Sequence, residues 1–123
     1  MSAPARELPL TVIGFPLRLG TKGAFSPISR ETKAASGLLQ ISMSPGSPPA
    51  TVFVTQDPSV GGFSGAPIID TGKSYPTESG GIQFRQGVFK VYGMSIGTIS
   101  DDTGGKLGVV VPSHFILEAM RMN

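Results

Sequence analysis

Glycine and proline recur along the whole chain, and they leave few runs long enough for a helix. The 123 residues include 17 glycines and 11 prolines. Between these interruptions lie segments rich in apolar and β-branched residues, a pattern typical of short strands joined by turns. Six strands are predicted, at residues 8–15, 33–43, 50–56, 66–70, 88–99 and 106–111. The spacing therefore predicts an all-β chain, folded as a six-stranded antiparallel barrel or sandwich.

Two segments depart from this strand pattern. Residues 71–87 form a long polar, glycine-rich connection, which predicts an extended hairpin or a mobile loop. The last residues predict a short C-terminal helix whose first turn is capped by Ser113. Phe115, Ala119 and Met122 share one face of this helix, so we expect it to pack against the strands. At this length, residues 1–123 are expected to form a single domain.

Composition and charge argue against several classes of function. The chain has no cysteine, which excludes disulfides and thiolate metal sites and leaves the compartment undecided. The formal net charge is only +2 and the lysines are scattered, so nucleic acid is not an expected partner. No apolar run approaches the roughly 20 residues that span a bilayer, and the N-terminus lacks the apolar core of an export signal. We therefore expect a soluble chain without a membrane partner, metal or cofactor.

The stretch GGFSGAPIID, residues 61–70, sets Ser64 between glycines and directly before a predicted strand. A serine hydroxyl serves acyl transfer when a base removes its proton and backbone amides hold the developing oxyanion. Gly61 and Gly62 permit the positive φ angles that aim successive amides at one point, and Gly65 lets a substrate backbone approach. The amides of Gly62 and Ser64 are therefore the candidate oxyanion donors. The alternative is a glycine-rich turn without chemistry, and a lipase-type elbow is excluded because no helix follows.

Several stretches resemble one family in order and spacing. GGFSGAPIID is similar to the segment around the nucleophile of trypsin-like serine proteases. VIGFPLRLG, from Val12, and TKAASGLLQ, from Thr32, resemble the start of the second barrel in HtrA-type (Deg-type) members. VYGMSIGTIS, from Val91, resembles the strand that pairs with the substrate backbone, and LGVVVPSHFILEAM, from Leu107, resembles the HtrA-type ending. The resemblance covers nearly the whole chain and implies the second six-stranded barrel of the chymotrypsin fold, with a short terminal helix.

The same resemblance implies that part of the catalytic machinery lies outside this chain. In the family the catalytic His and Asp belong to the first barrel, and this chain resembles only the second. The one histidine, His114, begins the terminal helix, and we interpret it as a partly exposed first-turn residue rather than a base. Asp57 is interpreted as a turn cap before Pro58, with an orienting carboxylate or the base of a specificity pocket as the alternatives. Asp101 and Asp102 are expected at a solvated hairpin tip.

The resemblance also maps a substrate pocket. Its base would lie at Pro58 and its walls would include Ile96, Gly97, Thr98 and Gly108. No charged side chain is expected at the base, so the predicted guest is a small or medium apolar side chain. A core role for Ile96 is the competing interpretation. An extended peptide would add to the strand edge from Gly93 to Thr98 by β-augmentation. Phe63 departs from the short polar residue of active members, and it either holds the loop or distorts the oxyanion turn.

The predicted function is the serine-bearing half of a trypsin-like serine endopeptidase, with Ser64 as nucleophile and the Gly62 amide in the oxyanion hole. Alone, the chain is expected to have little or no peptidase activity, because Ser64 lacks a positioned base. The expected partners are an extended peptide or protein substrate and a partner chain that carries the missing barrel. Whether the chain is an enzyme stays open, and the alternatives are a non-catalytic peptide-binding module and a remnant without a ligand. The face bared by the missing barrel predicts a homodimer.

Overall fold

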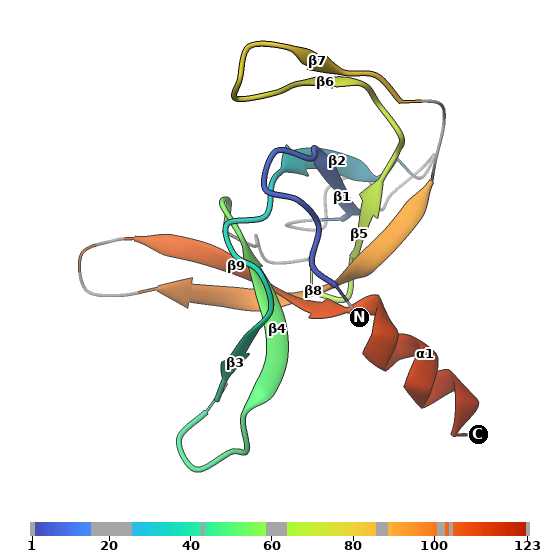
Figure 1. Cartoon of the computed structure of the whole chain (residues 1–123). Helices are drawn as coiled ribbons and strands as arrows, with labels where there is room; N and C mark the ends of the chain where they lie inside the picture. Colours follow the sequence, from blue (N-terminus) through green and yellow to red (C-terminus); the bar gives the residue numbers. More distant parts are fainter. Residues whose placement is uncertain are drawn as a thin grey trace.

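The computed structural model describes residues 2–15, 26–42, 44–58, 64–85, 89–100, 103 and 105–122 of the chain. This part is mostly β-structure and ends in one short helix, as Figure 1 shows. The predicted all-β class with a C-terminal helix is confirmed. In chain order the elements are β1 (Leu10–Gly14), β2 (Ile28–Thr32), β3 (Leu39–Ile41), β4 (Ala50–Thr55), β5 (Pro67–Asp70), β6 (Tyr75–Pro76), β7 (Ile82–Gln83), β8 (Lys90–Ser100), β9 (Lys106–Pro112) and α1 (Ser113–Arg121).

Seven of these strands form one antiparallel sheet, in the order β2-β1-β5-β8-β9-β4-β3. Valine and isoleucine are frequent in its strands, and their branched side chains suit a pleated, half-buried surface. The long hairpin β8–β9 runs from the pair Gly93↔Pro112 to the pair Ser100↔Lys106. The Ser100 and Lys106 ends of these strands extend away from the rest of the sheet at the left of Figure 1. The hairpin β6–β7 forms a separate two-stranded sheet at the top of the same view.

The predicted six-stranded barrel differs from this sheet in strand number and in closure. The hydrogen-bonded order has two ends, β2 and β3, so the ladder itself does not close. The additional strand is β2, which lies outside the six predicted strands. β3 covers only part of the predicted strand 33–43. Between them Ala34 makes a single bridge to Thr55, and the Val54 amide donates a hydrogen bond of 3.1 Å to the Ser36 hydroxyl. A side chain thus replaces a backbone partner there and interrupts the ladder.

The hydrophobic core is formed mainly by buried residues of β1, β4, β5 and β9. Phe53 of β4 is fully buried, as is Leu10 of β1. Val52 and Val54 are buried on the opposite face of β4, so this strand is covered on both sides. The main cluster consists of Leu8, Leu10, Val12, Ala34, Phe53, Ala66, Ile68 and Val110. Because Ala66 and Ile68 belong to it, the core fixes the chain directly after Ser64 against the rest of the sheet.

The helix α1 follows β9 without a loop and projects away from the sheet (Figure 1). The expectation that it packs on the strands through Phe115, Ala119 and Met122 holds only for its first turn: α1 contacts β8 and Phe115 is half-buried, whereas Ala119 is exposed and Met122 is 85% exposed. With no connecting residues between Pro112 and Ser113, the chain has no turn that would fold the helix back. Pro112 is the N-cap residue, and Ser113 makes no capping hydrogen bond, contrary to its predicted role. No helix in the described ranges is long and apolar enough to cross a membrane.

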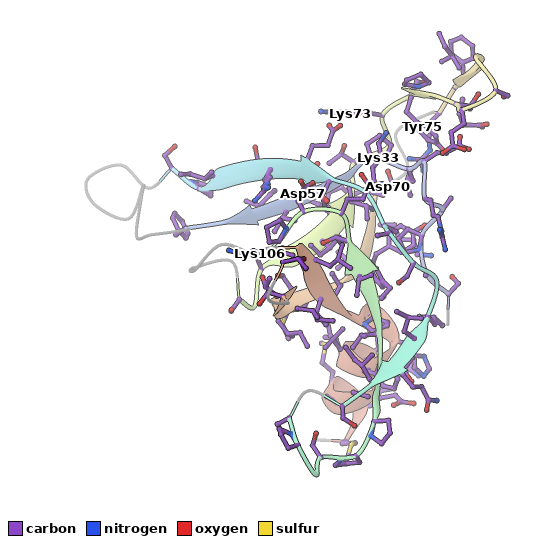
Figure 2. All side chains as sticks on the ribbon, turned by 90° about the vertical axis from the view of Figure 1, so that its left-hand side faces the viewer. Lys33, Asp57, Asp70, Lys73, Tyr75 and Lys106 are labelled. Atoms are coloured by element: carbon purple, nitrogen blue, oxygen red, sulfur yellow. The ribbon has the colours of Figure 1, made fainter. Side chains whose placement is uncertain are left out.

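The connection after β5 is an extended hairpin, which confirms one of its two predicted forms. An ion pair ties its far end to the sheet. The Nη1 and Nη2 atoms of Arg85 each donate a hydrogen bond of 2.5 Å to the carboxylate of Asp70. Asp70 is the last residue of β5 and is only 2% exposed. The Gly72 amide donates a further hydrogen bond of 2.8 Å to the same carboxylate. Figure 2 shows Asp70 at the base of the segment that carries Lys73 and Tyr75.

Candidate functional site

Ser64 lies in a turn that leads directly into β5. Its side chain is exposed, and Gly65 behind it has a φ of +84°, a backbone conformation that favours glycine. The strand that follows begins at Pro67, so the predicted order of serine, glycine and strand is confirmed. The predicted oxyanion donor Gly62, together with Gly61 and Phe63, lies outside the described residues.

Two backbone hydrogen bonds attach this turn to β8. The Gly65 amide donates to the Ser95 carbonyl at 2.7 Å, and the Ser95 amide donates to the Ala66 carbonyl at 2.9 Å. Just beyond, the register between β8 and β9 shifts between Ser95 and Gly97, which leaves Ile96 as an extra residue, as at a β-bulge. Such bulges bend a strand and increase its twist. The serine turn therefore sits beside the point where β8 changes direction.

Beyond this point β8 has a described neighbour on one side only. The pairing with β5 runs from Lys90 to Met94, whereas the pairing with β9 continues to Ser100. In the part of the chain that the structure describes, no strand ladder covers the other edge of β8 after the Ser95 contact. The first part of the predicted peptide edge, at Gly93, is therefore wrong, because Gly93 pairs with both β5 and β9. From Gly97 to Ser100, the described strand that pairs with β8 is β9.

The predicted pocket residues fall into two groups. Ile96 and Gly97 are half-buried and Thr98 is exposed along β8. Gly108 of β9 is buried and lines a separate narrow cavity of about 20 Å³ that also contains Pro58. The described residues that line this cavity are Val12, Arg30, Thr32, Thr55, Asp57, Pro58, Ile68, Ser95, Gly108 and Val110. The structure thus places Gly108 and Pro58 together, as predicted, and leaves the strand at 96–98 outside the lining of this cavity.

Gly108 is required by the close packing of the cavity wall. A Cβ added at this position would overlap the Thr55 hydroxyl and would lie only 2.6 Å from the Asp57 carbonyl oxygen. The same Thr55 hydroxyl donates a hydrogen bond of 2.9 Å to the Asp57 carbonyl. Any side chain at Gly108 would therefore push the chain after β4 away from β9.

The expectation of an uncharged base at Pro58 is wrong. Arg30 of β2 donates a hydrogen bond of 3.2 Å from Nη1 to the Pro58 carbonyl, and its Nη2 lies 3.4 Å from Asp57 Oδ1. These two residues are 28 positions apart, and no local pattern predicts their contact because β2 lies outside the six predicted strands. The Asp57 carboxylate thus pairs with an arginine rather than orienting a histidine. Asp57 is labelled in Figure 2.

No general base is apparent beside the serine. Among the residues that the structure describes, no side chain forms a hydrogen bond with the Ser64 hydroxyl. His114 Nε2 lies 3.1 Å from Glu118 Oε1, one turn along α1, and the imidazole is about half exposed. This confirms the interpretation of His114 as an exposed first-turn residue. The described ranges also contain no group of three His, Cys, Asp or Glu residues arranged to hold a metal ion.

Two polar features of the site region carry no local sequence signal. The first is the ion pair of Asp70 and Arg85. The Arg85 hydrogen bond is the main cause that lowers the pKa of Asp70, and the Gly72 amide adds to it, although burial opposes the shift. The second is Thr32, which is 5% exposed and whose hydroxyl finds no hydrogen-bond partner within the described ranges. A polar residue at an inward position of a strand would be the only hint of this second feature.

Comparisons of the chain with protein-family models, with curated proteins and with solved structures find no match.

Proposed function

We propose that this chain is the serine-bearing, peptide-binding half of a trypsin-like serine endopeptidase, and that it needs a base from another chain for hydrolysis. The observation that carries the proposal is the hydrogen bond from the Gly65 amide to the Ser95 carbonyl. It holds the exposed Ser64 turn at the place where the pairing of β8 with β5 ends and its pairing with β9 continues.

An extended peptide can use the edge of β8 as a template. It would add to β8 from Ile96 onward as an antiparallel strand, through backbone hydrogen bonds that do not depend on its sequence. A peptide held there in register would present one of its carbonyl groups to the neighbouring Ser64 turn. Positioning of this kind converts a bimolecular attack into an effectively intramolecular one.

The chemistry proposed for the complete enzyme is acyl transfer. The Ser64 oxygen would bond to the scissile carbonyl carbon while a base takes the hydroxyl proton, and that proton would pass to the departing amine as the C–N bond breaks. Water would then hydrolyse the ester and release Ser64. His114 is held by Glu118 on α1, so the base is assigned to a partner chain that carries the His and Asp.

The proposal includes a closed barrel in which β2 and β3 act as one bent strand. Three contacts support this arrangement: the bridge Ala34↔Thr55, the hydrogen bond of 2.8 Å from the Ala35 amide to the Val54 carbonyl, and the bond of 2.9 Å from the Gln56 amide to the Lys33 carbonyl. Together they join the chain that follows β2 to β4. The narrow cavity supports closure as well, because its lining draws on β1, β2, β4, β5, β8 and β9.

A second candidate function is a peptide-binding module without catalysis, as a monomer or a homodimer. The observation that favours it is that no described side chain forms a hydrogen bond with the Ser64 hydroxyl, whereas the pairing of β8 with β5 ends beside this turn. Exposed apolar side chains on the projecting strands fit a homodimer, among them Leu39, Ile99 and Leu107. This candidate shares the peptide site and differs only in the role of Ser64.

The two candidates differ in the reactivity of Ser64, which intact mass spectrometry can measure after exposure to a fluorophosphonate probe. The serine-peptidase proposal expects no labelling of the chain alone and slow labelling when imidazole is added as a substitute base. Ser64→Ala is the matched control and should stay unlabelled in both conditions. Labelling without imidazole would show that the chain or its oligomer contains a base, whereas no labelling with imidazole would favour the non-catalytic module.

A further inference from the structure

We propose that the chain forms a homodimer in which β3 of one copy pairs with β3 of a second copy, so that the two sheets join across a two-fold axis. The inference goes beyond the proposed function, because it names the surface of self-association and involves neither Ser64 nor the peptide site. Four observations carry it: the position of β3 in the sheet, the charge of the segment around it, its register with itself, and the surface area of the chain.

β3 is the last strand at one end of the seven-stranded sheet. Among the described residues, its only ladder partner is β4. Leu38 and Leu39 are 37% and 41% exposed, and Gln40 is exposed as well. Figure 1 shows β3 and β4 extending away from the rest of the sheet at the bottom of the view. An edge strand that presents apolar side chains to water is a template for another strand.

The turn between β3 and β4 is held in one conformation. The Ser47 amide donates a hydrogen bond of 3.1 Å to the Ser44 carbonyl, and Gly46 has a φ of +80°. With Pro45 before this glycine, the pattern is that of a type II turn. The Ser47 hydroxyl donates a further bond of 2.7 Å to the Ser44 carbonyl, and the Ser42 hydroxyl donates one of 3.1 Å to the Ser47 carbonyl. The strand edge is therefore preorganised, which reduces the entropy lost on association.

The segment around β3 carries no charge. From Ala34 to Gln56 the sequence has 23 residues without Asp, Glu, Lys, Arg or His. Native edge strands are commonly protected from self-association by charged side chains, lysine above all. In a two-fold interface each surface meets a copy of itself, so a charged patch would face like charge. An uncharged segment avoids this repulsion, which favours a second copy over a partner of opposite charge.

The sequence of β3 is suited to pairing with itself. Two strands related by a two-fold axis perpendicular to the sheet are antiparallel, and the residue on the axis lies opposite its own copy. With Gln40 on the axis, Leu39 lies opposite Ile41 of the second copy, and the two Gln40 amides can exchange hydrogen bonds on the other face. Moving the axis to Leu39 would place Ile41 opposite Gly37 and lose this match.

The same pairing covers apolar surface on one face of the sheet. A groove of about 460 Å³ is lined by Ile41, by Ser42 directly after β3, and by Thr98, Ile99 and Ser100 of β8. Ile99 is 40% exposed. Leu39 of the second copy, opposite Ile41, would stand at the rim of this groove and remove part of its apolar lining from water.

The surface area of the chain is large for its mass. A compact monomer of 12.7 kDa exposes about 6,200 Å², whereas this chain exposes 7789 Å². The surplus of about 1,500 Å² is more than the roughly 800 Å² that each partner contributes to a standard interface. The chain therefore has enough surface for one such interface. Because β3 is short, we expect a dimer that depends on protein concentration.

Crosslinking tests the position of the two-fold axis. The chain has no cysteine, so a single introduced thiol reports on one position without background. In Gln40→Cys the two thiols lie opposite each other, with Cβ atoms about 4.5 to 5.5 Å apart, close to the separation in a disulfide. We expect the disulfide-linked dimer to form about tenfold faster than in Gln83→Cys, the matched control, which changes an exposed glutamine of β7. Non-reducing gels of the full chain under mild oxidation measure both rates.

A charge at the same position tests the interface without a covalent bond. Gln40→Lys places two ammonium groups opposite each other and should lower the dimer fraction, whereas Gln83→Lys should keep it. Sedimentation velocity of the wild type and both variants, from about 10 µM to about 1 mM, measures the dimer fraction. Both glutamines are exposed, so the variants are expected to fold, and circular dichroism checks this.

The outcomes are distinct. A concentration-dependent dimer that Gln40→Lys weakens, together with the faster crosslinking of Gln40→Cys, supports the inference. A wild-type monomer at every concentration, a dimer that Gln40→Lys leaves intact, or equal crosslinking of the two cysteine variants overturns it. None of these results bears on the peptide site, so the proposed function stands in each case.

Discussion

The Gly65 amide donates a hydrogen bond of 2.7 Å to the carbonyl of Ser95, and this bond joins the serine turn to β8. The two residues lie 30 positions apart in the sequence, yet the bond sets Ser64 beside the only part of β8 that β5 leaves uncovered within the described ranges. In the proposed function, the exposed hydroxyl and this part of β8 form one site. The following predictions test the parts of this site.

Replacing Gly65 should strain the serine turn. Gly65→Ala adds a Cβ with no atom within 4 Å, so the cost comes from its φ of +84° and is expected to be about 1 to 2 kcal/mol of unfolding free energy. Gly97→Ala is the matched control, because Gly97 also has open space around it and no positive φ. Urea unfolding of both variants measures the difference. Equal stability of the two variants would show that the turn does not need this backbone conformation.

Replacing Gly108 should distort the cavity. In Gly108→Ala the new Cβ overlaps the Thr55 hydroxyl and approaches the Asp57 carbonyl, and overpacking of this kind costs about 1 to 3 kcal/mol. Thermal unfolding measures this loss of stability, again with Gly97→Ala as control. A Gly108→Ala variant as stable as the wild type would contradict the close packing of this wall.

Removing the Thr32 hydroxyl should stabilise the free protein. Thr32→Val replaces an unsatisfied buried hydroxyl with a methyl group of similar shape, and we expect a gain of about 1 kcal/mol in the free energy of unfolding. Thr11→Val on β1 is only half-buried and serves as the control. Chemical denaturation gives both values. A loss of stability in Thr32→Val would mean that the hydroxyl is satisfied in solution, for example by a water in the cavity.

The ion pair of Asp70 and Arg85 should make the free energy of unfolding depend on pH in the acidic range. The Arg85 and Gly72 hydrogen bonds lower the pKa of Asp70 from its usual 3.8. Because the folded pKa lies below the unfolded one, this stabilisation is fully present above the unfolded value and is lost as the pH falls through the folded pKa. We expect unfolding free energy to decline between roughly pH 5 and pH 2.

Asp70→Asn isolates this contribution. At neutral pH it should lower the free energy of unfolding by about 2 kcal/mol, less than for a fully buried pair because Arg85 is 17% exposed and regains water. The variant should also show a shallower decline in acid than the wild type. Asp57→Asn, whose ion pair is partly exposed, is the matched control and should change neutral stability little. Identical acid profiles for wild type and Asp70→Asn would refute the assignment.

Local patterns in the sequence were sufficient for several parts of the fold. The apolar run after Ser64 predicts β5, and the two apolar segments around the polar tip predict the hairpin β8–β9. In these strands hydrophobic residues face a buried surface, so the signal and the structure have the same cause. The position of Ser64 before a strand followed from the same signal.

Other parts depend on contacts that no local pattern encodes. β2 has the sequence ISRET, and its inward positions end in the polar residue Thr32, so it shows no apolar face. The strand was therefore not predicted, and neither was the ion pair of Arg30 with Asp57. The apolar stripe of α1 predicts a helix but does not say where the helix lies, and only its first residues contact the sheet, because the helix continues directly from β9. The partner of Asp70 comes from 15 residues away, across the hairpin.

The most direct test of the central claim is to map peptide binding on the assigned amide spectrum of the isotope-labelled chain, with an acetylated alanine tetrapeptide amide as the probe. The account predicts that the largest chemical-shift changes fall on residues 96–100 of β8 and on Ser64 and Gly65. Ser64→Ala should retain the changes along β8, because peptide binding does not require the hydroxyl. Changes confined to other surfaces, such as β3 or α1, or no change at saturating peptide, would contradict the account.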